Sequence, residues 1–385
     1  MKQVVRKKIA EANNITQDPL IYTALIDGNN MLKLSQVSHE TSSQGLEYGA
    51  VLQFFLQMKK MLTHRDYNFV YVMWDGLNSG ILRYNIYKDY KKNRDKNYEG
   101  ASKKTDYDKF IDGYVANVLR HSREKKHQES EEDAFDRQKM IIQQCLEEMC
   151  IRQIECENVE GDDLIAYYIK NKKPNEKIVI YSNDRDLSQL VSQDVMIYVP
   201  SFKEYVHINN FKKKFGFTQE NLVLKKILCG DASDNISGIK GLGEKSFLTY
   251  FPDAVERKLS IDEVTTKAKE LLDERAKNKK KPLKVLENII NRVTDGCQGK
   301  DIYEINKKII DLSEPMLTDE AIEEINGIMY APLDYTHRSF DRVYQIMIEN
   351  GLTKFLETDY FSKFFSPFNR IMEVEKKYAM EMENG

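Results

Sequence analysis

Cysteine is scarce and unpatterned in this sequence of 385 residues. The five cysteines are odd in number and form no C-x-x-C pair. This excludes a disulfide framework and a cysteine zinc site as interpretations of the sequence. We therefore expect a protein of a reducing compartment, the cytoplasm.

Long apolar runs are also missing. No stretch approaches the roughly 20 apolar residues that a membrane span needs, and the amino-terminal MKQVVRKKIAEANN lacks the apolar core of a signal peptide. We expect a soluble protein with no membrane partner. Its 41% of apolar residues are enough to fill a core.

An overall positive charge is absent too. The formal net charge of −3 argues against a general nucleic-acid coat protein. Residues 81–126 nevertheless hold 13 Lys and Arg against 7 Asp and Glu. This local excess predicts a segment that faces a polyanion, next to an acidic pocket formed by other parts of the chain.

Acidic residues follow several predicted strands directly. The apolar runs of LIYTALIDGNN and NFVYVMWDG each end in Asp-Gly, and two further strands, in IRQIEC and EKIVIYS, lead into acidic turns. Helical patterns lie between these strands, which predicts an α/β fold with a mostly parallel sheet. The acids at the strand ends are Asp27, Asp75, Glu160, Asp162, Asp163, Asp184 and Asp186.

These acids would meet at the carboxyl edge of such a sheet, where α/β proteins place their sites. Asp231 and Asp234, in CGDASDN, would join them. So many carboxylates repel one another unless cations are present. An all-oxygen set without His or Cys favours Mg²⁺ or Mn²⁺ over zinc. A single Asp after a strand is more often a turn former or helix cap, and Asp163 is the acid we most expect to be a cap.

A glycine-rich turn follows directly in GIKGLGEKSF. Gly238, Gly241 and Gly243 would expose backbone N–H groups to phosphate oxygens, and Lys245 would add a positive charge. The turn lacks the GK[ST] ending of a nucleotide P-loop, so ATP is not the expected ligand.

The basic segment LRYNIYKDYKKNRDK interleaves cations with tyrosines. Such a mixture suits single-stranded nucleic acid, because cations pair with phosphates and tyrosine rings stack on unpaired bases. A solvated helix face is the competing interpretation. The residues predicted to contact nucleic acid here are Arg83, Lys88, Tyr90, Lys91, Lys92 and Arg94.

Together, five ordered stretches resemble the 5′ nuclease superfamily: LIDGNN, WDG with RYNIYKDYKKNR, VEGDDLIA, SNDRDLSQL and GDASDNISGIKGLGEK. The superfamily includes flap endonucleases, the 5′ nuclease domains of bacterial DNA polymerases, and phage 5′ exonucleases and RNase H enzymes. The resemblance implies an α/β nuclease domain over residues 1–210 with a helical arch at about 83–135. It also implies a helical part over 211–385, with a helix–three-turn–helix element at about 222–250 and a C-terminal extension.

The resemblance further implies the roles of residues. Two or more Mg²⁺ or Mn²⁺ ions are expected, and a potassium ion at the glycine-rich turn. Asp184 would lie near both divalent ions, and Lys91 and Arg94 would face the scissile phosphate. One metal group would comprise Asp27, Asp75, Glu160 and Asp162, and the other Asp186, Asp231 and Asp234. Gly161 departs from the alanine usual in the family, and the arginine usual after the first Asp-Gly is missing, with Lys33 the nearest cation.

The implied activity is hydrolysis of phosphodiesters near single-strand/double-strand junctions in DNA replication or repair, with RNA primer removal included. The expected partners are flapped, nicked or branched DNA or an RNA–DNA hybrid, and a replisome protein at the C-terminal part. We expect a monomer, in the host cytoplasm if the source is a phage.

Two other classes compete with this interpretation. Haloacid-dehalogenase phosphatases use an aspartate nucleophile but need D-x-D at the first strand end, where Asp27 is followed here by Gly28 and Asn29. A catalytically inactive DNA-binding replisome component would have lost acids that this chain keeps. The aromatic segment YFSKFFSPF is interpreted as a core strip under the last helix rather than a partner-docking segment.

Overall fold

A six-stranded sheet forms the centre of the molecule. In the computed structural model, which describes residues 19–36, 40–42, 45–92, 130–294, 302–352 and 358–384, its strand order is β3-β2-β1-β4-β5-β6. All neighbours pair in parallel except β5 and β6, which confirms the predicted mostly parallel sheet. The strands are β1 (Ile21–Asp27), β2 (Phe69–Asp75), β3 (Arg152–Cys156), β4 (Glu176–Tyr181), β5 (Val195–Val199) and β6 (Glu204–Val206).

Alternating residues of the central strands enter two separate cores. In β1, Ala24 and Ile26 belong to one apolar cluster and Leu25 to the other, as expected for side chains that alternate across a strand. The first face is covered by α2 (Gly28–Ser35), α3 (Gly49–His64) and α6 (Glu131–Glu148). The opposite face is covered by α7 (Gly161–Lys170) and α8 (Ile208–Phe215).

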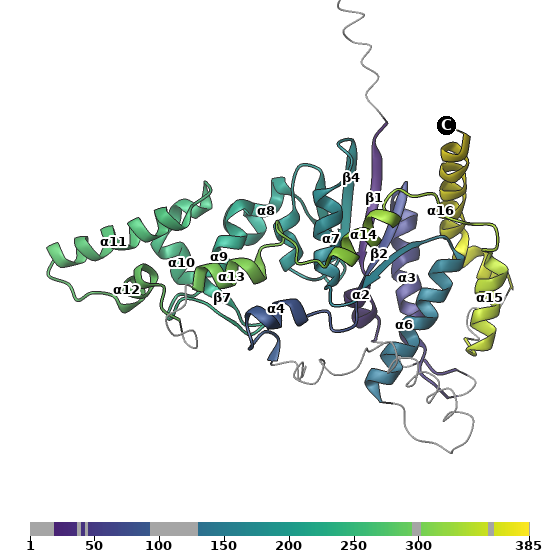
Figure 1. Ribbon diagram of the computed structural model, residues 1–385, viewed down its shortest axis with the longest axis horizontal. Coiled ribbons are helices and arrows are strands. Elements are labelled where there is room, and N and C mark those ends of the chain that lie inside the picture. The colour runs from purple at the N-terminus through teal and green to yellow at the C-terminus, as the bar shows by residue number, and fades with distance from the viewer. Residues whose placement is uncertain are drawn as a thin grey trace, which may run out of the picture.

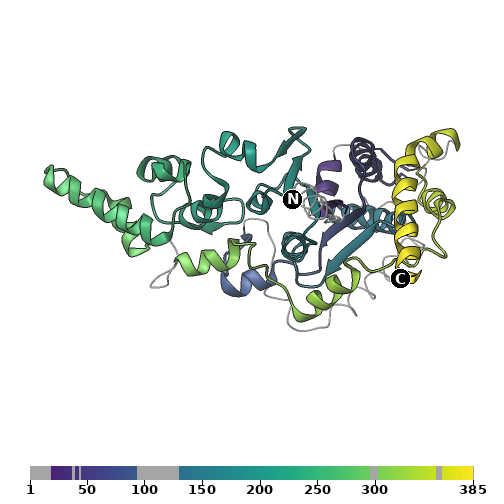
Figure 2. The same ribbon diagram turned by 90° about the horizontal axis from the view of Figure 1, so that it is seen from above.

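The last helices return to the sheet from the far end of the chain. Helix α14 (Asp319–Ile328) joins the α7 face, whereas α15 (Phe340–Glu349) and α16 (Thr358–Asn384) pack with α3 and α6 on the other face (Figure 2). Phe364, Phe365 and Phe368 of α16 are buried, and the ring centroids of Phe55 and Phe365 lie 5.8 Å apart. The segment YFSKFFSPF is therefore a core strip, as predicted.

The remaining helices form an elongated extension on one side of the sheet (Figure 1). They pack around their own apolar cluster, which includes Leu228, Phe247 and Ile289. These elements are α9 (Leu222–Cys229), α10 (Glu244–Tyr250), α11 (Ile261–Lys277), α12 (Lys284–Asn291) and α13 (Ile302–Ile310). The short elements are α4 (Ile81–Ile86), β7 (Gly230–Asp231), β8 (Ile236–Ser237) and the 3-10 turns η2 (Asp186–Leu190), η3 (Gln219–Asn221) and η4 (Pro252–Val255).

The four predicted strands and the helices between them are confirmed, but β5 and β6 were not predicted. Residues 93–129, which hold most of the predicted arch, lie outside the described residues. The division at residue 210 stays a prediction, because Phe211, Phe217 and α14 all pack into the cluster that α7 forms with the sheet. None of the helices that the structure describes is both long and apolar enough to span a membrane.

Candidate metal centre and nucleic-acid interface

The first carboxylate lies where the direction of the chain through the sheet reverses. Strands β1, β2 and β3 run outward in order, and β4 then returns to the other side of β1, which is the crevice where α/β folds place ligands. At the end of β1, Asp27 accepts a hydrogen bond from Ser182 Oγ, just beyond β4, at 2.7 Å. Its other oxygen caps α2 by accepting from Asn30 N at 3.0 Å. Burial raises the pKa of Asp27 to about 7, and the charge of Asp75 adds to the rise.

Further carboxylates come from β2, α7 and the turn after β4. Asp75 Oδ1 accepts a hydrogen bond from Gly161 N at 2.8 Å, so the end of β2 is joined to the start of α7. Burial raises the pKa of Asp162 well above its ordinary value, and the charges of Asp184 and Asp27 add most to that effect. The charges of Asp27, Asp75, Glu160 and Asp184 therefore all act on Asp162, so these strand-end acids lie near one edge of the sheet.

Glu160 is held by cations of the chain itself. Lys91 Nζ lies 2.5 Å from Glu160 Oε1, and Arg83 Nη1 lies 3.0 Å from Oε2. Tyr90 donates its hydroxyl to Oε2 at 2.9 Å. Burial alone would raise the pKa of Glu160, but Lys91 and Arg83 outweigh it and hold the pKa at about 2. The side chain is an anion at neutral pH.

Asp163 and Arg83 form a buried ion pair. Asp163 has no exposed surface; Arg83 Nη2 donates to its Oδ1 at 2.9 Å, and Met316 N donates to the same oxygen. We had expected Asp163 to cap α7, and it does not. Its carboxylate faces Arg83 rather than the other acids. Arg83 is 5% exposed and also donates to the carbonyl oxygen of Ile309. In this position it cannot contact DNA, because its guanidinium is used within the fold.

Two of the three acids of the second predicted metal group, Asp186 and Asp231, pair with a lysine that the sequence did not point to, whereas Asp234 accepts a hydrogen bond from Tyr90 at 3.4 Å. Lys226 Nζ, on α9, forms ion pairs with Asp186 Oδ1 and with Asp231 Oδ2, the latter at 2.7 Å. Burial would raise the pKa of Asp231, but Lys226 and hydrogen bonds from Ser233 lower it to about 2. Burial raises the pKa of Asp186 to about 6 in spite of the same lysine. Asp186 also reaches the first group, because its N–H donates to Asp184 Oδ1 at 2.8 Å.

The donor set fits a hard divalent ion by its chemistry. It consists of carboxylates from five segments, and burial together with mutual repulsion raises the pKa of Asp27 and Asp162, which a bound divalent ion would counteract. In the part of the chain that the structure describes, no three His, Cys, Asp or Glu side chains are grouped tightly enough to bind one ion as they stand. Lys91, Arg83 and Lys226 instead pair with Glu160, Asp186 and Asp231.

The basic segment lies beside these acids, but two of its three tyrosines are buried and the third, Tyr84, is half-buried. Tyr87 and Tyr90 are 8% and 2% exposed and pack with Ile227, Ile236 and helix α13. Base stacking on Tyr90, which we expected, is therefore excluded in this arrangement, because the ring is buried. Lys88 and Lys92 are exposed, and Lys91 lies among the carboxylates. Arg94 lies outside the described residues.

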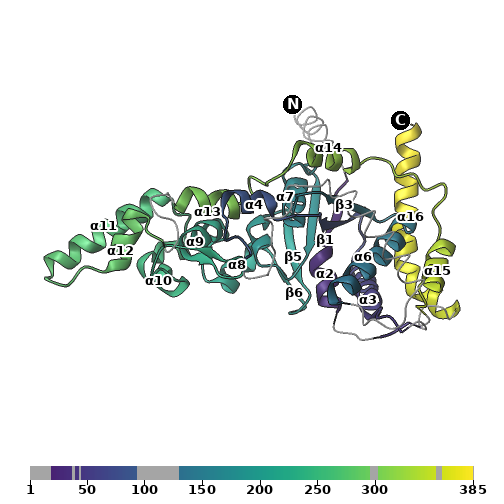
Figure 3. The ribbon, with the colours of Figure 1, turned by 60° about the horizontal axis from the view of Figure 1, so that its bottom comes forward.

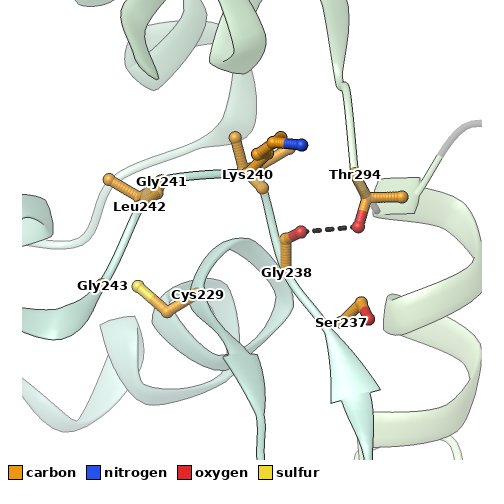
Figure 4. A pocket seen from close by; sticks show the side chains of 9 residues that line it. Cys229, Ser237, Gly238, Lys240, Gly241, Leu242, Gly243 and Thr294 are labelled. Carbon is orange, nitrogen blue, oxygen red and sulfur yellow. Dashed lines mark hydrogen bonds between the residues drawn. The ribbon is translucent and has the colours of Figure 1, made fainter. Parts of the chain in front are cut away.

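The glycine-rich turn links α9 to α10 and is closed by its own hydrogen bonds. Gly238 lies against the backbone of Gly230: a Cβ on Gly238 would come within 2.3 Å of Gly230 N. Gly241 has a φ of +84°, which disfavours any side chain. We expected the N–H of Gly243 to be available to a phosphate. It instead donates to Ser246 Oγ at 2.9 Å. Lys245 is exposed. Figure 4 shows the shallow pocket along this turn.

Sequence reasoning missed Lys226, Ser182 and the pairing of Arg83 with Asp163. Lys226 lies 40 residues from Asp186 and Arg83 lies 80 from Asp163, so no local pattern joins these two pairs, whereas Asp231 lies only five residues after Lys226. Ser182 directly precedes the acidic turn after β4, and a serine at a strand end was the one available signal.

The fold and the acidic edge of the sheet define the class: an α/β protein with a carboxylate centre at the switch point and a helical element beside it (Figure 3). The chain belongs to the family described as 5′-3′ exonuclease, N-terminal resolvase-like domain, whose model matches residues 22–216. The family and the fold confirm the resemblance to 5′ nucleases.

Curated relatives match parts of the chain. DNA polymerase I of Bacillus subtilis is 28% identical over 264 residues, 65% of this chain and 26% of the polymerase. The 5′-3′ exonuclease of Mycoplasmopsis pulmonis is 39% identical over 87 residues, 22% of this chain and 29% of that protein. The 5′-3′ exonuclease of Aquifex aeolicus is 29% identical over 172 residues, 44% of this chain and 58% of that protein. The chain thus spans well under two thirds of the length of these relatives.

Solved structures show the same fold. The 5′-exonuclease of bacteriophage T5, with zinc bound, has a TM-score of 0.51 at 14% identity and covers 86% of this chain and 98% of its own. The flap endonuclease of the same phage, in a complex with DNA and metal ions, has a TM-score of 0.51 at 16% identity, with 92% and 99% covered.

Proposed function

We propose that the protein is a divalent-metal-dependent, structure-specific 5′ nuclease that hydrolyses phosphodiesters near single-strand/double-strand junctions. The observation that carries the proposal is the meeting of carboxylates from β1, β2, α7 and the turn after β4, with Lys91 among them. Membership of the 5′-3′ exonuclease family supports the reaction class.

The carboxylates have distinct proposed roles toward the ions. Asp27, Asp75, Glu160 and Asp162 would hold one ion, Asp186, Asp231 and Asp234 the other, and Asp184 lies between the two groups. When bound, the ions would supply activation of water and neutralisation of the charge that develops on the phosphate. Mg²⁺ or Mn²⁺ is the proposed metal because every donor is an oxygen.

Lys91 is the residue that we propose acts on the phosphate. Its ammonium pairs with Glu160 in the absence of substrate, and it would offset charge on the non-bridging oxygens once that carboxylate binds a metal ion. Its backbone is fixed, since Lys91 N donates to the carbonyl oxygen of Asp234 at 2.9 Å. A charge that is already held in position costs little reorganisation during the reaction. Arg94 is proposed to assist it.

The substrate would lie along the exposed cations beside this centre. Lys88 and Lys92 would contact the strand that enters, and Lys245 the duplex backbone at the glycine-rich turn, where we also propose a potassium ion. Flapped, nicked or branched DNA and RNA–DNA hybrids are the proposed substrates, since the T5 flap endonuclease was solved with DNA. We further propose that the protein acts as a monomer in the cytoplasm and contacts a replisome protein through its C-terminal helices.

A gel assay tests the function directly. The chain is incubated with a 5′-flap DNA labelled at either end, with Mg²⁺ or with EDTA, and in parallel with an RNA-primed duplex. We expect metal-dependent products cut near the junction, with the two labels distinguishing stepwise from internal cleavage. DNA binding without cleavage would favour an inactive scaffold, and turnover of a small phosphomonoester would favour a phosphatase.

A further inference from the structure

The α11–α12 hairpin, residues 261–294, forms the end of the molecule that points away from the sheet (Figure 1). Its tip has the sequence RAKNKKKPLK, residues 275–284, with six Lys and Arg and no acid. Lys277, Lys280 and Lys281 are exposed and form no ion pair with any residue that the structure describes. Asp273 and Glu274 lie one helical turn back, so the tip keeps a clear positive excess.

The hairpin is fixed to the glycine-rich turn by three hydrogen bonds. Thr294 Oγ1 donates to the carbonyl oxygen of Gly238 at 2.7 Å (Figure 4). Buried Asn288 donates its amide to the carbonyl oxygen of Lys240 at 2.9 Å, and Lys240 N donates to the carbonyl oxygen of Val293 at 3.0 Å. The basic tip is therefore held at a defined position relative to the turn.

We propose that the basic tip binds the phosphate backbone of duplex DNA beyond the glycine-rich turn. The proposal rests on the proposed function, which puts duplex at that turn. Helix α11 has 17 residues and so reaches roughly 25 Å at 1.5 Å per residue, or about seven base pairs at 3.4 Å each. Lysine contacts to phosphates release counterions and carry no sequence preference. The tip would thus increase the length of duplex DNA that the protein contacts.

Duplex-arm length provides the test. The full chain and the variant Lys277→Gln/Lys280→Gln/Lys281→Gln are titrated by fluorescence anisotropy with flap DNAs whose downstream arms have about 6 or about 24 base pairs. The tip is not expected to reach the short arm. For the long arm we expect about tenfold weaker binding, and a salt dependence that is less steep by about two to three phosphate contacts. The control variant neutralises three exposed lysines elsewhere: Lys60, Lys170 and Lys377.

The outcomes separate the two proposals. The proposed role of the tip is overturned if the tip variant loses equal affinity for the short-arm and long-arm DNAs. It is also overturned if the variant loses no more affinity than the control variant does. A wild-type chain that binds neither arm contradicts the proposed function itself.

A second inference comes from an independent observation at Lys226. This side chain is 12% exposed and its ammonium bridges Asp186 and Asp231, whose side chains are 26% and 10% exposed. Three residues, two acids and one base, thus form a partly buried cluster with a net charge of −1. The same two acids belong to one of the two proposed metal groups.

We propose that the ammonium of Lys226 is a built-in cation of the second acid group, which a second divalent ion must displace. The proposal rests on the proposed function. Binding of the ion would break both ion pairs of Lys226, and that cost lowers the affinity of the second group relative to the first. The second ion would therefore bind in full only when substrate phosphate offers Lys226 a new partner.

Metal binding without substrate tests this role. Mn²⁺ binding is measured by electron paramagnetic resonance in wild type, Lys226→Met and Lys225→Met. Lys225 is a matched control, because it is the adjacent lysine on α9 and pairs with Glu244 at 2.8 Å instead. We expect Lys226→Met to bind the second ion about tenfold or more tightly, since two carboxylates lose their compensating charge, and Lys225→Met to match wild type.

A variant that keeps the charge supplies a further comparison. Lys226→Arg keeps the cation and is expected to bind the second ion no more tightly than wild type. Unchanged or weaker binding of the second ion by Lys226→Met overturns the proposal, as does an arginine variant that binds the ion as tightly as the methionine variant. Lys226→Gln, which also removes the charge, is judged by the same criterion if the methionine variant fails to fold. A wild-type chain that binds no Mn²⁺ at all contradicts the proposed function instead.

Discussion

The backbone N–H of Lys91 donates to the carbonyl oxygen of Asp234 at 2.9 Å, across 143 residues of sequence. Nearby, the side chain of Asn235 donates to the carbonyl oxygen of Asp89 at 2.7 Å. The basic segment after β2 and the acidic loop after α9 are thus joined by one backbone hydrogen bond and by one from the side chain of Asn235. The lysine proposed to meet the phosphate is positioned by the loop that supplies Asp231 and Asp234.

Replacing Lys91 with Ala should slow single-turnover cleavage of a 5′ flap by about 10²- to 10³-fold, the effect of removing one preorganised electrostatic partner. DNA affinity should change little, because one of several cations is lost. Lys170→Ala is the control, since Lys170 lies outside the proposed substrate path, is 50% exposed and pairs with Glu314. A cleavage rate for Lys91→Ala equal to that of Lys170→Ala would show that Lys91 has no part in the reaction.

Gly238→Ala should destabilise the protein by about 1–3 kcal/mol, as overpacking does, and weaken duplex binding. A Cβ at this position meets backbone atoms of Cys229 and Gly230 at 2.2 and 2.3 Å, and backbone cannot move aside cheaply. Gly243→Ala is the matched control, because nothing lies within 4 Å of its added Cβ. Thermal unfolding and anisotropy measure both effects, and equal behaviour of the two variants would show that the close approach has no role.

Glu375→Ala should lower the free energy of unfolding by about 3–5 kcal/mol, the cost of leaving a buried cation unpaired. Arg152 Nε and Nη2 donate to Glu375 at 2.8 and 2.7 Å, and both side chains are almost fully buried. This pair fastens α16 to β3. Urea unfolding of Glu373→Ala provides the control, because Glu373 is 61% exposed. A loss below about 1 kcal/mol for Glu375→Ala, the range of an exposed pair, would mean that the pair does not hold α16.

Asp27 should make the stability of the metal-free protein depend on pH. Its pKa is raised from 3.8 to about 7 by burial and then by Asp75, so between these values the folded chain binds a proton that the unfolded chain has lost. The contribution of this group to the free energy of unfolding is complete below pH 3.8 and is lost as the pH rises through about 7. The melting temperature of wild type should therefore fall more than that of Asp27→Asn between pH 5 and pH 8. Identical pH profiles of the two proteins would contradict the raised pKa.

The strand-end acids were predictable and their neutralising partners were not. Apolar runs that end in Asp27 or Asp75 carry their own signal, because strand, turn and acid are adjacent in sequence. Arg83 pairs with Asp163, and Lys226 with Asp186, only after the fold brings distant segments together. The burial of the tyrosines could not be predicted from the sequence either. Alternating Tyr and Lys suggested a stacking surface, yet Tyr87 and Tyr90 fill a small core with Ile227 and Ile236.

In the C-terminal third, too, the sequence indicated local structure but not how distant segments pack. The periodicity of residues 255–385 predicted helices correctly, but not that α14, α15 and α16 return to cover both faces of the sheet. The strand Val195–Val199 and its antiparallel neighbour of three residues were not predicted.

The most direct test of the account is cleavage by Asp184→Ala, because the charge of Asp184 acts both on Asp162 of the first carboxylate group and on Asp186 of the second. The variant is assayed on a labelled 5′-flap DNA with Mg²⁺, and its DNA affinity is measured in parallel. Asp194→Ala, an acid at the opposite edge of the sheet that pairs with Lys172 and Lys177, is the control. The account predicts that Asp184→Ala loses Mg²⁺-dependent cleavage and keeps DNA binding, whereas Asp194→Ala keeps both. Cleavage by Asp184→Ala at the wild-type rate would contradict it.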